Sequence, residues 1–327
     1  MKTLSKQIIE YGGEIKPLDL KIFNRPLHGY FNPSIFNDQG SLYLNLRSCD
    51  YTIFHSEKGS TFLYNNSLNY FGVEGKSTFT TKNYFAYIST KYLKPEFGCV
   101  VVTDEFDKEP QWRFTGLEDA RLVKWDGKFY LCGTRRDTES TGIGRMELSE
   151  IVVEHAYSKE VKRYRIPTPG DDSSYCEKNW MPIVSKPYHF VKWTNPTEVV
   201  KYDINTNKCQ TVVLKEESDK LSNNLRGGSQ IIDWGEEHYL GIVHQSYHSY
   251  DDQNRFDNEY KQQFILWDSE WNIVKYSPQF SVMGAKIEFI SSLTICYGDV
   301  IITFGHQDNS SYILRVSQNF VEEILNG

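Results

Sequence analysis

The sequence predicts an all-β protein built as a single five-bladed β-propeller with a central active-site channel. Aromatic residues make up 15% of the 327 residues, and such residues are enriched in strands. Short apolar segments with a period of two are bounded by turn residues, whereas only residues 3–11 and 317–325 have the pattern of a short helix. In addition, one hairpin pattern recurs five times along the chain.

Each copy of the repeat has a strand that opens with small or turn-forming residues, a tight turn, and a strand that ends in polar residues. The copies are residues 33–47, 120–135, 181–194, 229–245 and 292–307. Their turns contain pairs such as Asp126-Gly127, which is hairpin chemistry. A four-stranded propeller blade needs about 40–50 residues, so each interval allows one blade with loop insertions.

A β-sandwich also contains regularly spaced hairpins. It has no reason, however, to repeat the same hairpin five times with polar residues at the same strand end. The first interval is the longest, and a sixth blade within 34–120, around residues 84–92, stays open. We expect one domain over residues 1–327, with short extensions of about 1–25 and 317–327.

Charge and composition exclude several classes of protein. The formal net charge of −7 argues against a nucleic-acid partner, because binding phosphates needs clustered Lys and Arg in excess. The first 13 residues lack the apolar core of a signal peptide, and no stretch of 18 apolar residues occurs. We therefore expect a cytoplasmic protein without stable membrane insertion. The six cysteines are scattered as expected for reduced thiols, and no motif predicts a metal or another cofactor.

Charged and aromatic residues gather at the ends of the predicted hairpins, which radial repetition would place around one opening. These candidates are Arg47, Asp50, Tyr51, Glu118, Asp119, Arg121, Arg135, Arg136, Lys178, Trp180, Arg226, His244, Tyr247, Glu288 and Asp308. Guanidinium groups bind phosphate oxygens in pairs, aromatic faces stack on sugar rings, and a carboxylate can move a proton to or from a sugar oxygen. The pattern predicts a cationic pocket for a phosphate-bearing sugar. Arg121, taken alone, favours an ion pair that stabilises the fold.

The sharpest motif lies in residues 116–130. Gly116, Glu118, Asp119 and Arg121 are followed by an apolar strand, an Asp-Gly turn and an aromatic strand. This segment resembles the Gly-x-Glu-Asp-Pro-Arg signature of glycoside hydrolase family 130, the β-mannoside phosphorylases, and of the related five-bladed β-mannosyltransferases. Ala120 stands where the family has proline. Three later segments resemble the family's later blades in the same order, namely residues 178–182, 227–247 and 288–308.

The resemblance implies roles for particular residues. Asp119 falls on the family's general acid, with Glu118 and Arg121 as substrate-binding or orienting neighbours, while phosphate attacks the anomeric carbon with inversion. The positions that match phosphate-binding residues of the family are Arg135, Arg136, Lys178, His244 and Tyr247. The remaining candidates are assigned to the substrate or, for Arg226, to the donor. The sequence also resembles propeller domains attached to bacterial glycosyltransferases, which favours a role in glycan assembly.

We therefore expect a carbohydrate-active enzyme that transfers a glycosyl group with inversion. Its partners would be a glycan acceptor and a small-molecule, phosphate-bearing sugar donor. A nucleotide sugar would make it a glycosyltransferase, and a sugar 1-phosphate would make it a glycoside phosphorylase.

Two alternatives stay open. An inverting hydrolase of the same fold needs a second carboxylate as base, and Glu288 and Asp308 are available for that role. A propeller that binds glycans without catalysis would need the aromatic side chains but no oriented acid.

Overall fold

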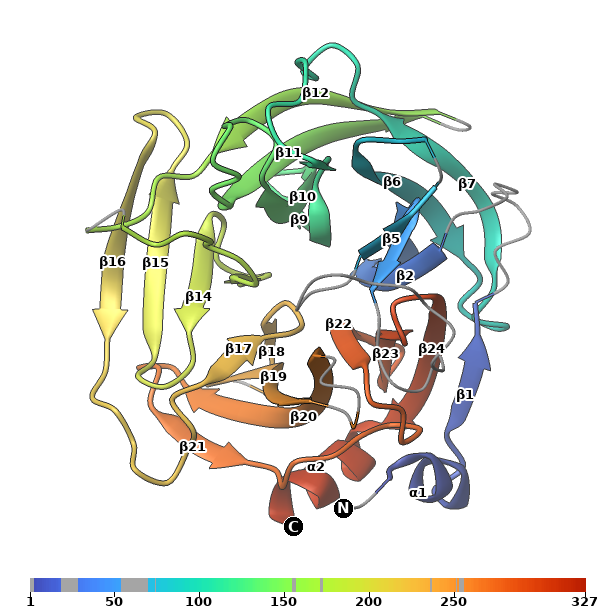
Figure 1. Cartoon of the computed structure of the whole chain (residues 1–327). Helices are drawn as coiled ribbons and strands as arrows, with labels where there is room; N and C mark the ends of the chain where they lie inside the picture. The colour runs from blue at the N-terminus through green and yellow to red at the C-terminus, as the bar shows by residue number, and fades with distance from the viewer. Residues whose placement is uncertain are drawn as a thin grey trace.

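The computed structural model describes residues 3–18, 29–53, 70–73, 75–154, 157–170, 173–235, 237–250, 252 and 256–327. These residues are mostly in β-strands, as the sequence predicts. Figure 1 shows the sheets standing around a common centre, with the chain passing from one sheet to the next. Within the described residues the sheets divide into five units, each with about four main strands, and the first strand of each unit lies nearest the centre.

The first two units share one continuous sheet. The first unit consists of β2 (Gly29–Asp38), β3 (Ser41–Cys49), β6 (Phe79–Ile88) and β7 (Pro95–Val102), in that order. The second consists of β9 (Glu118–Trp125), β10 (Lys128–Arg135), β11 (Arg145–Glu154) and β12 (Tyr157–Arg165). Their outermost strands, β7 and β12, pair in parallel over two residues each. Three short strands lie beside the first unit: β4 (Tyr51–Ile53) pairs with β5 (Tyr70–Gly72), and β8 (Phe114–Thr115) pairs with β6.

The other three units follow in chain order. The third consists of β13 (Met181–Pro182), β14 (His189–Trp193), β15 (Glu198–Asp203) and β16 (Lys208–Leu214). The fourth consists of β17 (Leu225–Gly227), β18 (Ile232–Asp233), β19 (His238–Tyr250), β20 (Phe256–Asp268) and β21 (Ile273–Tyr276). The fifth consists of β22 (Glu288–Cys296), β23 (Asp299–His306), β24 (Ser310–Ser317) and β1 (Glu14–Pro17).

The two ends of the chain meet in the fifth unit. Strand β1 pairs antiparallel with β24, and Arg315 Nε lies 3.3 Å from Glu14 Oε1. Helices α1 (Ser5–Glu10) and α2 (Gln318–Asn326) lie together in Figure 1 and bury Ile8 and Phe320 in the same hydrophobic cluster. The helices predicted near both termini are therefore confirmed. The chain's first strand completes the sheet that its last strands began.

The five predicted hairpins are confirmed as antiparallel pairs. They are β2–β3, β9–β10, β13–β14, β18–β19 and β22–β23. The segment proposed for a sixth blade lies largely in β6, which pairs with β3 and β7 inside the first unit. Within the described part of 34–120, the long interval thus supplies outer strands and the short strands β4, β5 and β8. All six cysteines are free thiols. No helix in the described ranges is long and apolar enough to cross a membrane.

Buried polar side chains join the inner strands of different units. Ser34 Oγ in β2 accepts a hydrogen bond of 2.9 Å from the amide of Leu122 in β9. Two further bonds reach backbone oxygens of β2, namely Gln230 Nε2 to Ile35 O at 2.7 Å and Ser291 Oγ to Pro33 O at 2.6 Å. Strand β2 is thereby bonded to the second, fourth and fifth units, through the Ser34 side chain and through its own backbone oxygens.

The bond between Ser34 and Leu122 should contribute measurably to stability. In Ser34→Ala the buried Leu122 amide loses its acceptor, which costs about 1–3 kcal/mol. We expect urea unfolding to show a loss of that size. The control Ser41→Ala, at an exposed position in β3, should change the unfolding free energy by less than about 0.5 kcal/mol. Equal stability of the two variants would contradict the bonding described above.

Candidate active site

A cavity of about 340 Å³ opens where the inner ends of the units meet. Nine of the residues singled out from the sequence line it: Arg47, Tyr51, Glu118, Asp119, Arg136, Lys178, Arg226, His244 and Asp308. These residues lie in or directly beside strands of all five units. None of them lies in the outermost strand of its unit. The structure therefore brings together residues that are up to 261 positions apart in the sequence, from Arg47 to Asp308.

Four cavity-lining residues have a left-handed backbone. Their φ angles are 51° at Asn32, 48° at Asp119, 62° at Asn179 and 46° at Asp308. Asn and Asp tolerate this region better than other residues with a side chain, and such conformations concentrate at functional sites. Asn32 and Asp119 lie in the first strands of the first and second units, and Asn179 lies two residues before the first strand of the third unit. The same local device therefore shapes the wall of the cavity in the first three units.

Glu118 and Asp119 are neighbours in β9, yet both line the cavity. In a regular strand successive side chains point to opposite faces. Here the pairing of β9 with β10 shifts by one residue between Cys132 and Thr134, and Asp119 has a positive φ. A bulge of this kind redirects side chains at the end of a strand. The irregularity thus brings two carboxyl groups to one side.

Asp119 is held as a carboxylate by two donors and two positive charges. Its Oδ1 accepts hydrogen bonds from Asn32 Nδ2 at 2.8 Å and from Arg47 Nη1 at 2.6 Å. Burial by itself raises the pKa of Asp119, but the charges of Arg47 and Arg121 outweigh it and lower the pKa to about 2. Asp119 is therefore ionised at neutral pH in the unliganded protein.

Glu118 has the opposite tendency. Burial raises its pKa, the positive charge of Arg47 opposes that change, and the negative charge of Asp119 adds to it. Two adjacent carboxyl groups often have pKa values displaced in opposite directions where one group carries a proton and the other stays ionised. Glu118 is thus the carboxyl group of this pair that protonates more readily.

Arg47 is packed within an aromatic cluster. Its guanidinium lies 4.9 Å from the centre of the Phe31 ring, and Nη2 donates a hydrogen bond to the hydroxyl of Tyr51. Tyr51 also packs against Phe114, with ring centres 5.8 Å apart. Burial raises the pKa of Tyr51 well above its usual value, so its hydroxyl stays neutral. The cluster gives the cavity an apolar wall and keeps Arg47 on Asp119.

Three cations in the cavity have no carboxylate partner among the described residues: Arg136, Lys178 and Arg226. Arg136 is nevertheless fixed in place. Its Nε donates to Gly142 O at 3.0 Å, its Nη2 donates to the Tyr175 hydroxyl at 2.6 Å, and its guanidinium lies 5.5 Å from the Phe114 ring centre. Positive charges left unneutralised inside a cavity indicate a site for an anion.

His244 in β19 is only 3% exposed, and its buried Nδ1 has no hydrogen-bond partner among the described residues. Burial is the main cause that lowers its pKa to about 3, followed by the positive charges of Arg121 and Lys178. The imidazole is therefore neutral at physiological pH and offers a ligand one donor and one acceptor. The rings of Tyr260 and Phe289 pack against it, with centres 5.1 and 4.9 Å away. An unpartnered polar atom at such a depth favours a bound ligand in the cavity.

Six of the candidates lie outside the cavity, which corrects the expectation that all of them line one channel. They are Asp50, Arg121, Arg135, Trp180, Tyr247 and Glu288. Arg121 is 1% exposed, and its guanidinium donates to the backbone oxygens of Gly228 and Asp119 and to Asn179 Oδ1. Burial lowers its pKa to about 10, so it stays charged. Arg121 thus bonds units to one another behind Asp119, through backbone and amide oxygens and not through the ion pair that its sequence context favoured.

Two of these six residues have carboxylates that accept hydrogen bonds from backbone amides. Glu288 is fully buried, and its Oε1 accepts hydrogen bonds of 2.9 Å from the amides of Met283 and Ala285. Asp50 accepts the amide of Thr80 at 2.6 Å and pairs with Lys76 at 3.0 Å. Their oxygens are occupied by the protein itself. Glu288 is therefore a poor candidate for the base of a hydrolase.

The other three candidates are also engaged elsewhere. Arg135 forms an ion pair with Glu147, with Nε and Oε2 2.8 Å apart. Trp180 is buried and donates from Nε1 to Glu177 Oε2 at 2.9 Å. Tyr247 is 40% exposed, and its hydroxyl donates to Gln279 Oε1 at 2.8 Å. A strand-end position therefore does not decide whether a side chain faces the centre.

The structure adds cavity residues that were not singled out from the sequence. They are Phe31, Asn32, Thr52, Tyr70, Phe114, Asn179, Ser246, His248, Asn258, Tyr260 and Phe289. Asn32 and Asn179 could have been found, because they stand before the first and third copies of the hairpin as Asp119 stands before the second. The aromatic residues carry no such signal, since core strands have the same composition. Among the residues with described side chains, no cluster of three or more His, Cys, Asp or Glu could hold a metal ion.

No protein-family model matches the sequence, and no curated protein matches it either. Solved structures do match the fold over most of the chain. The fold is that of the family 130 mannoside phosphorylases, a mannosyltransferase and several glycoside hydrolases, so the resemblance expected from the sequence is confirmed at the level of the fold.

Three of these structures illustrate the range of activities among the matching proteins. The β-1,2-mannobiose phosphorylase from Listeria innocua has a TM-score of 0.53 and 12% identity, covering 95% of this chain and 96% of that chain. MPT-1, a GDP-Man-dependent mannosyltransferase from Leishmania mexicana, has a TM-score of 0.55 and 14% identity, with 98% and 96% covered. A glycosyl hydrolase from Bacteroides ovatus has a TM-score of 0.56 and 13% identity, with 89% and 85% covered.

The low pKa of Asp119 predicts a pH dependence of stability. Its folded pKa of about 2 lies below its usual value of 3.8, so its ionisation stabilises the fold above about pH 4, and this contribution is lost as the pH falls to about 2. We expect the wild type to lose about 2 kcal/mol more than Asp119→Asn over that range in urea unfolding. Parallel pH profiles of the two proteins would show that Asp119 is not held ionised.

Proposed function

We propose that the protein is a carbohydrate-active enzyme that transfers a glycosyl group with inversion, using a phosphate-bearing donor. In this proposal the five sheet units are the blades of a five-bladed propeller, and the central cavity is its active site. The observation that carries the proposal is the pairing, within one cavity, of an ionised carboxylate with three cations that lack a carboxylate partner among the described residues. This arrangement fits a reaction in which one group gives up a proton while another leaves as an anion.

In the transfer direction, an acceptor hydroxyl oxygen attacks the anomeric carbon of the donor. The bond between that carbon and the donor's phosphate oxygen breaks, and the phosphate leaves with the electron pair. The acceptor's proton passes to Asp119, which is already ionised and can accept it. Attack from the face opposite the leaving phosphate inverts the configuration at the anomeric carbon.

The reverse direction is phosphorolysis. A phosphate oxygen attacks the anomeric carbon, the glycosidic bond breaks, and the leaving sugar oxygen takes a proton from the acid. Asp119 would first need that proton, although its pKa is about 2 in the unliganded protein. The same carboxyl group would therefore act as base in transfer and as acid in phosphorolysis, and its ionised resting state is the form from which transfer begins.

The donor's phosphate would bind to Arg136, Lys178 and Arg226, with neutral His244 as a further hydrogen-bond partner. Two relatives of the same fold point to mannose as the first sugar to test, since one is a β-1,2-mannobiose phosphorylase and the other is a GDP-Man-dependent mannosyltransferase. Both a sugar 1-phosphate and a nucleotide sugar carry the phosphate that this cation group would hold.

Hydrolysis is supported less well. Inverting hydrolases need a second carboxylate that activates water, and Glu288 is occupied by backbone amides. Asp308 is the remaining sequence-predicted candidate for that role in the cavity. Three cations beside it would favour bound phosphate over water.

Ligand-induced stabilisation tests the donor site. A ligand at about 100 times its dissociation constant adds about 2.7 kcal/mol of stability. We expect the melting temperature to rise with inorganic phosphate and with one sugar 1-phosphate or nucleotide sugar. Arg136→Ala should abolish this rise, whereas Lys6→Ala, which removes an exposed cation of α1, should keep it. The cation-site assignment fails if phosphate and all phosphate-bearing sugars leave the wild type unchanged.

Replacing Asp119 separates catalysis from binding. Asp119→Asn removes the proton acceptor but leaves the cations in place, so turnover should fall by about 10²–10⁴-fold while the donor-induced rise in melting temperature persists. The measurement is product formation by chromatography alongside thermal unfolding. Unchanged turnover would contradict the role of Asp119. Release of free sugar without phosphate, lost in Asp308→Asn, would instead indicate a hydrolase.

A further inference from the structure

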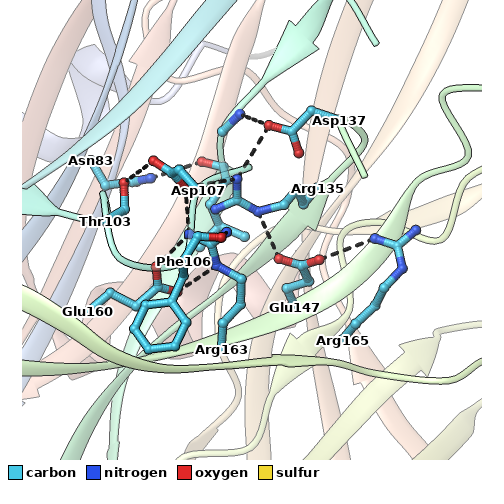
Figure 2. A network of polar contacts seen from close by, with 12 residues as sticks. Asn83, Thr103, Phe106, Asp107, Arg135, Asp137, Glu147, Glu160, Arg163 and Arg165 are labelled. Atoms are coloured by element: carbon cyan, nitrogen blue, oxygen red, sulfur yellow. Dashed lines mark hydrogen bonds and ion pairs between the residues drawn. The ribbon is translucent and has the colours of Figure 1, made fainter. Parts of the chain in front are cut away.

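Besides Arg121, which donates to Asp119 O, three polar side chains hold the backbone that carries Glu118 and Asp119. Asn83 Nδ2 donates to Leu117 O at 2.9 Å, and Asn45 Nδ2 donates to Ala120 O at 3.0 Å. The third contact is made by Asp137, whose Oδ2 accepts a hydrogen bond of 2.9 Å from the amide of Gly116. Asn83 and Asp137 are among the labelled residues of the polar network in Figure 2.

Leu117 and Ala120 pack into a hydrophobic cluster with Leu122 and Leu131, but this packing is interrupted on one side of the segment. A second cavity, of about 240 Å³, lies there and is lined by Thr115, Gly116 and Leu117 as well as by Arg135 and Asp137. Close-packed cores fix their elements through many van der Waals contacts, and a void forfeits those contacts. On the side of this cavity, the segment is therefore held by the hydrogen bonds that reach its backbone.

Gly116 can be held only through its backbone. Its φ is 91°, and a Cβ atom at this position would lie 2.2 Å from Thr81 O. No residue with a side chain fits there. A hydrogen bond to the Gly116 amide can therefore fix this position. Among the described residues, Asp137 is the partner of that amide.

Asp137 is itself fixed by a chain of buried ion pairs, drawn in Figure 2. Its Oδ2 lies 3.4 Å from Arg135 Nη1, and Arg135 Nε lies 2.8 Å from Glu147 Oε2. Glu147 Oε1 in turn lies 3.2 Å from Arg165 Nη1. The side chains of Arg135 and Glu147 are 5% and 2% exposed. Opposite charges at this depth are weakly screened by salt, so they hold the Asp137 carboxylate firmly.

A second carboxylate meets the same arginine without touching the segment. Asp107 Oδ1 lies 3.8 Å from Arg135 Nη1 and 2.7 Å from Arg163 Nη2. Its other hydrogen bond comes from Thr103, at 2.7 Å. Asp107 therefore provides a matched control: it shares Arg135 with Asp137 but makes no hydrogen bond to residues 116–120 in the described structure.

We propose that Asp137 is a positioning residue for Glu118 and Asp119, because its hydrogen bond to the Gly116 amide fixes the backbone turn that brings both carboxyl groups into the cavity. The inference rests on the proposed function for its kinetic consequence only. The cation site should be affected less, because Arg136 is held separately by Gly142 O and the Tyr175 hydroxyl. A displacement of about 1 Å in a reacting group can cost about 10²-fold in rate.

The kinetic test compares Asp137→Ala, Asp137→Asn and Asp107→Ala. We expect Asp137→Ala to lower kcat by about 10–100-fold with a donor KM within about threefold of the wild type. Asp137→Asn keeps an acceptor oxygen for Gly116 and should restore most of kcat. Asp107→Ala should lower the melting temperature by breaking the same ion-pair network, yet leave kcat near the wild-type value. Equal losses of kcat in the two alanine variants would overturn the proposal.

A second readout does not depend on knowing the reaction. Carboxyl ¹³C NMR can follow the titration of Asp119, which Arg47 and Asn32 hold ionised in the wild type. In Asp137→Ala the pKa of Asp119 should rise from about 2 towards its usual value of 3.8, and in Asp107→Ala it should not. An unchanged titration in Asp137→Ala would overturn the positioning role.

Failure of the proposed function can be distinguished from failure of the positioning role of Asp137. If the wild type transfers no sugar from any donor but Asp119 responds as described, the proposed function fails and the positioning role stands. If Asp137→Ala does not fold, Asp137→Ser replaces it, because its shorter side chain cannot place an oxygen where Oδ2 accepts the Gly116 amide. The same comparison with Asp107→Ala then decides the outcome.

Discussion

The site depends on one electrostatic arrangement, the placement of the Asp119 carboxylate near two buried guanidinium groups. Arg47 donates to it directly, and Arg121 lies behind it, bonded to backbone oxygens of two units. A buried cation without a compensating anion is costly. Asp119 therefore offsets the burial of two arginines, and they in turn keep it ionised. Fold stability and the proposed proton transfer rest on the same three side chains.

The cavity brings together carboxyl groups and cations that come from different strands. Glu118 and Asp119 come from the end of β9, whereas Arg136, Lys178 and Arg226 lie beside the second, third and fourth units. The carboxyl groups are coupled to Arg47 and to each other, while the three cations have no carboxylate partner in the described structure. An acceptor hydroxyl and a donor phosphate would meet opposite chemistry in one small volume.

The architecture was readable from the sequence because its signals are local. Alternation with a period of two and turn residues at fixed places gave the five hairpins, and the Glu118-Asp119 motif marked the centre of the site. The sequence did not predict which single polar residues line the cavity. Glu288 and Asp308 both sit at strand ends of the fifth unit, yet one caps buried amides and the other lines the cavity. That difference follows from contacts with segments distant in the sequence.

We propose that the cavity performs inverting transfer with a phosphate-bearing donor. The most direct test is ¹H and ³¹P NMR of the wild type with α-configured sugar 1-phosphates and nucleotide sugars, beginning with those of mannose, in the presence of oligosaccharide acceptors. We expect a product with the β configuration, formed in step with an equal amount of released phosphate or nucleotide. A product with retained configuration, or no release from any donor, would contradict this proposal.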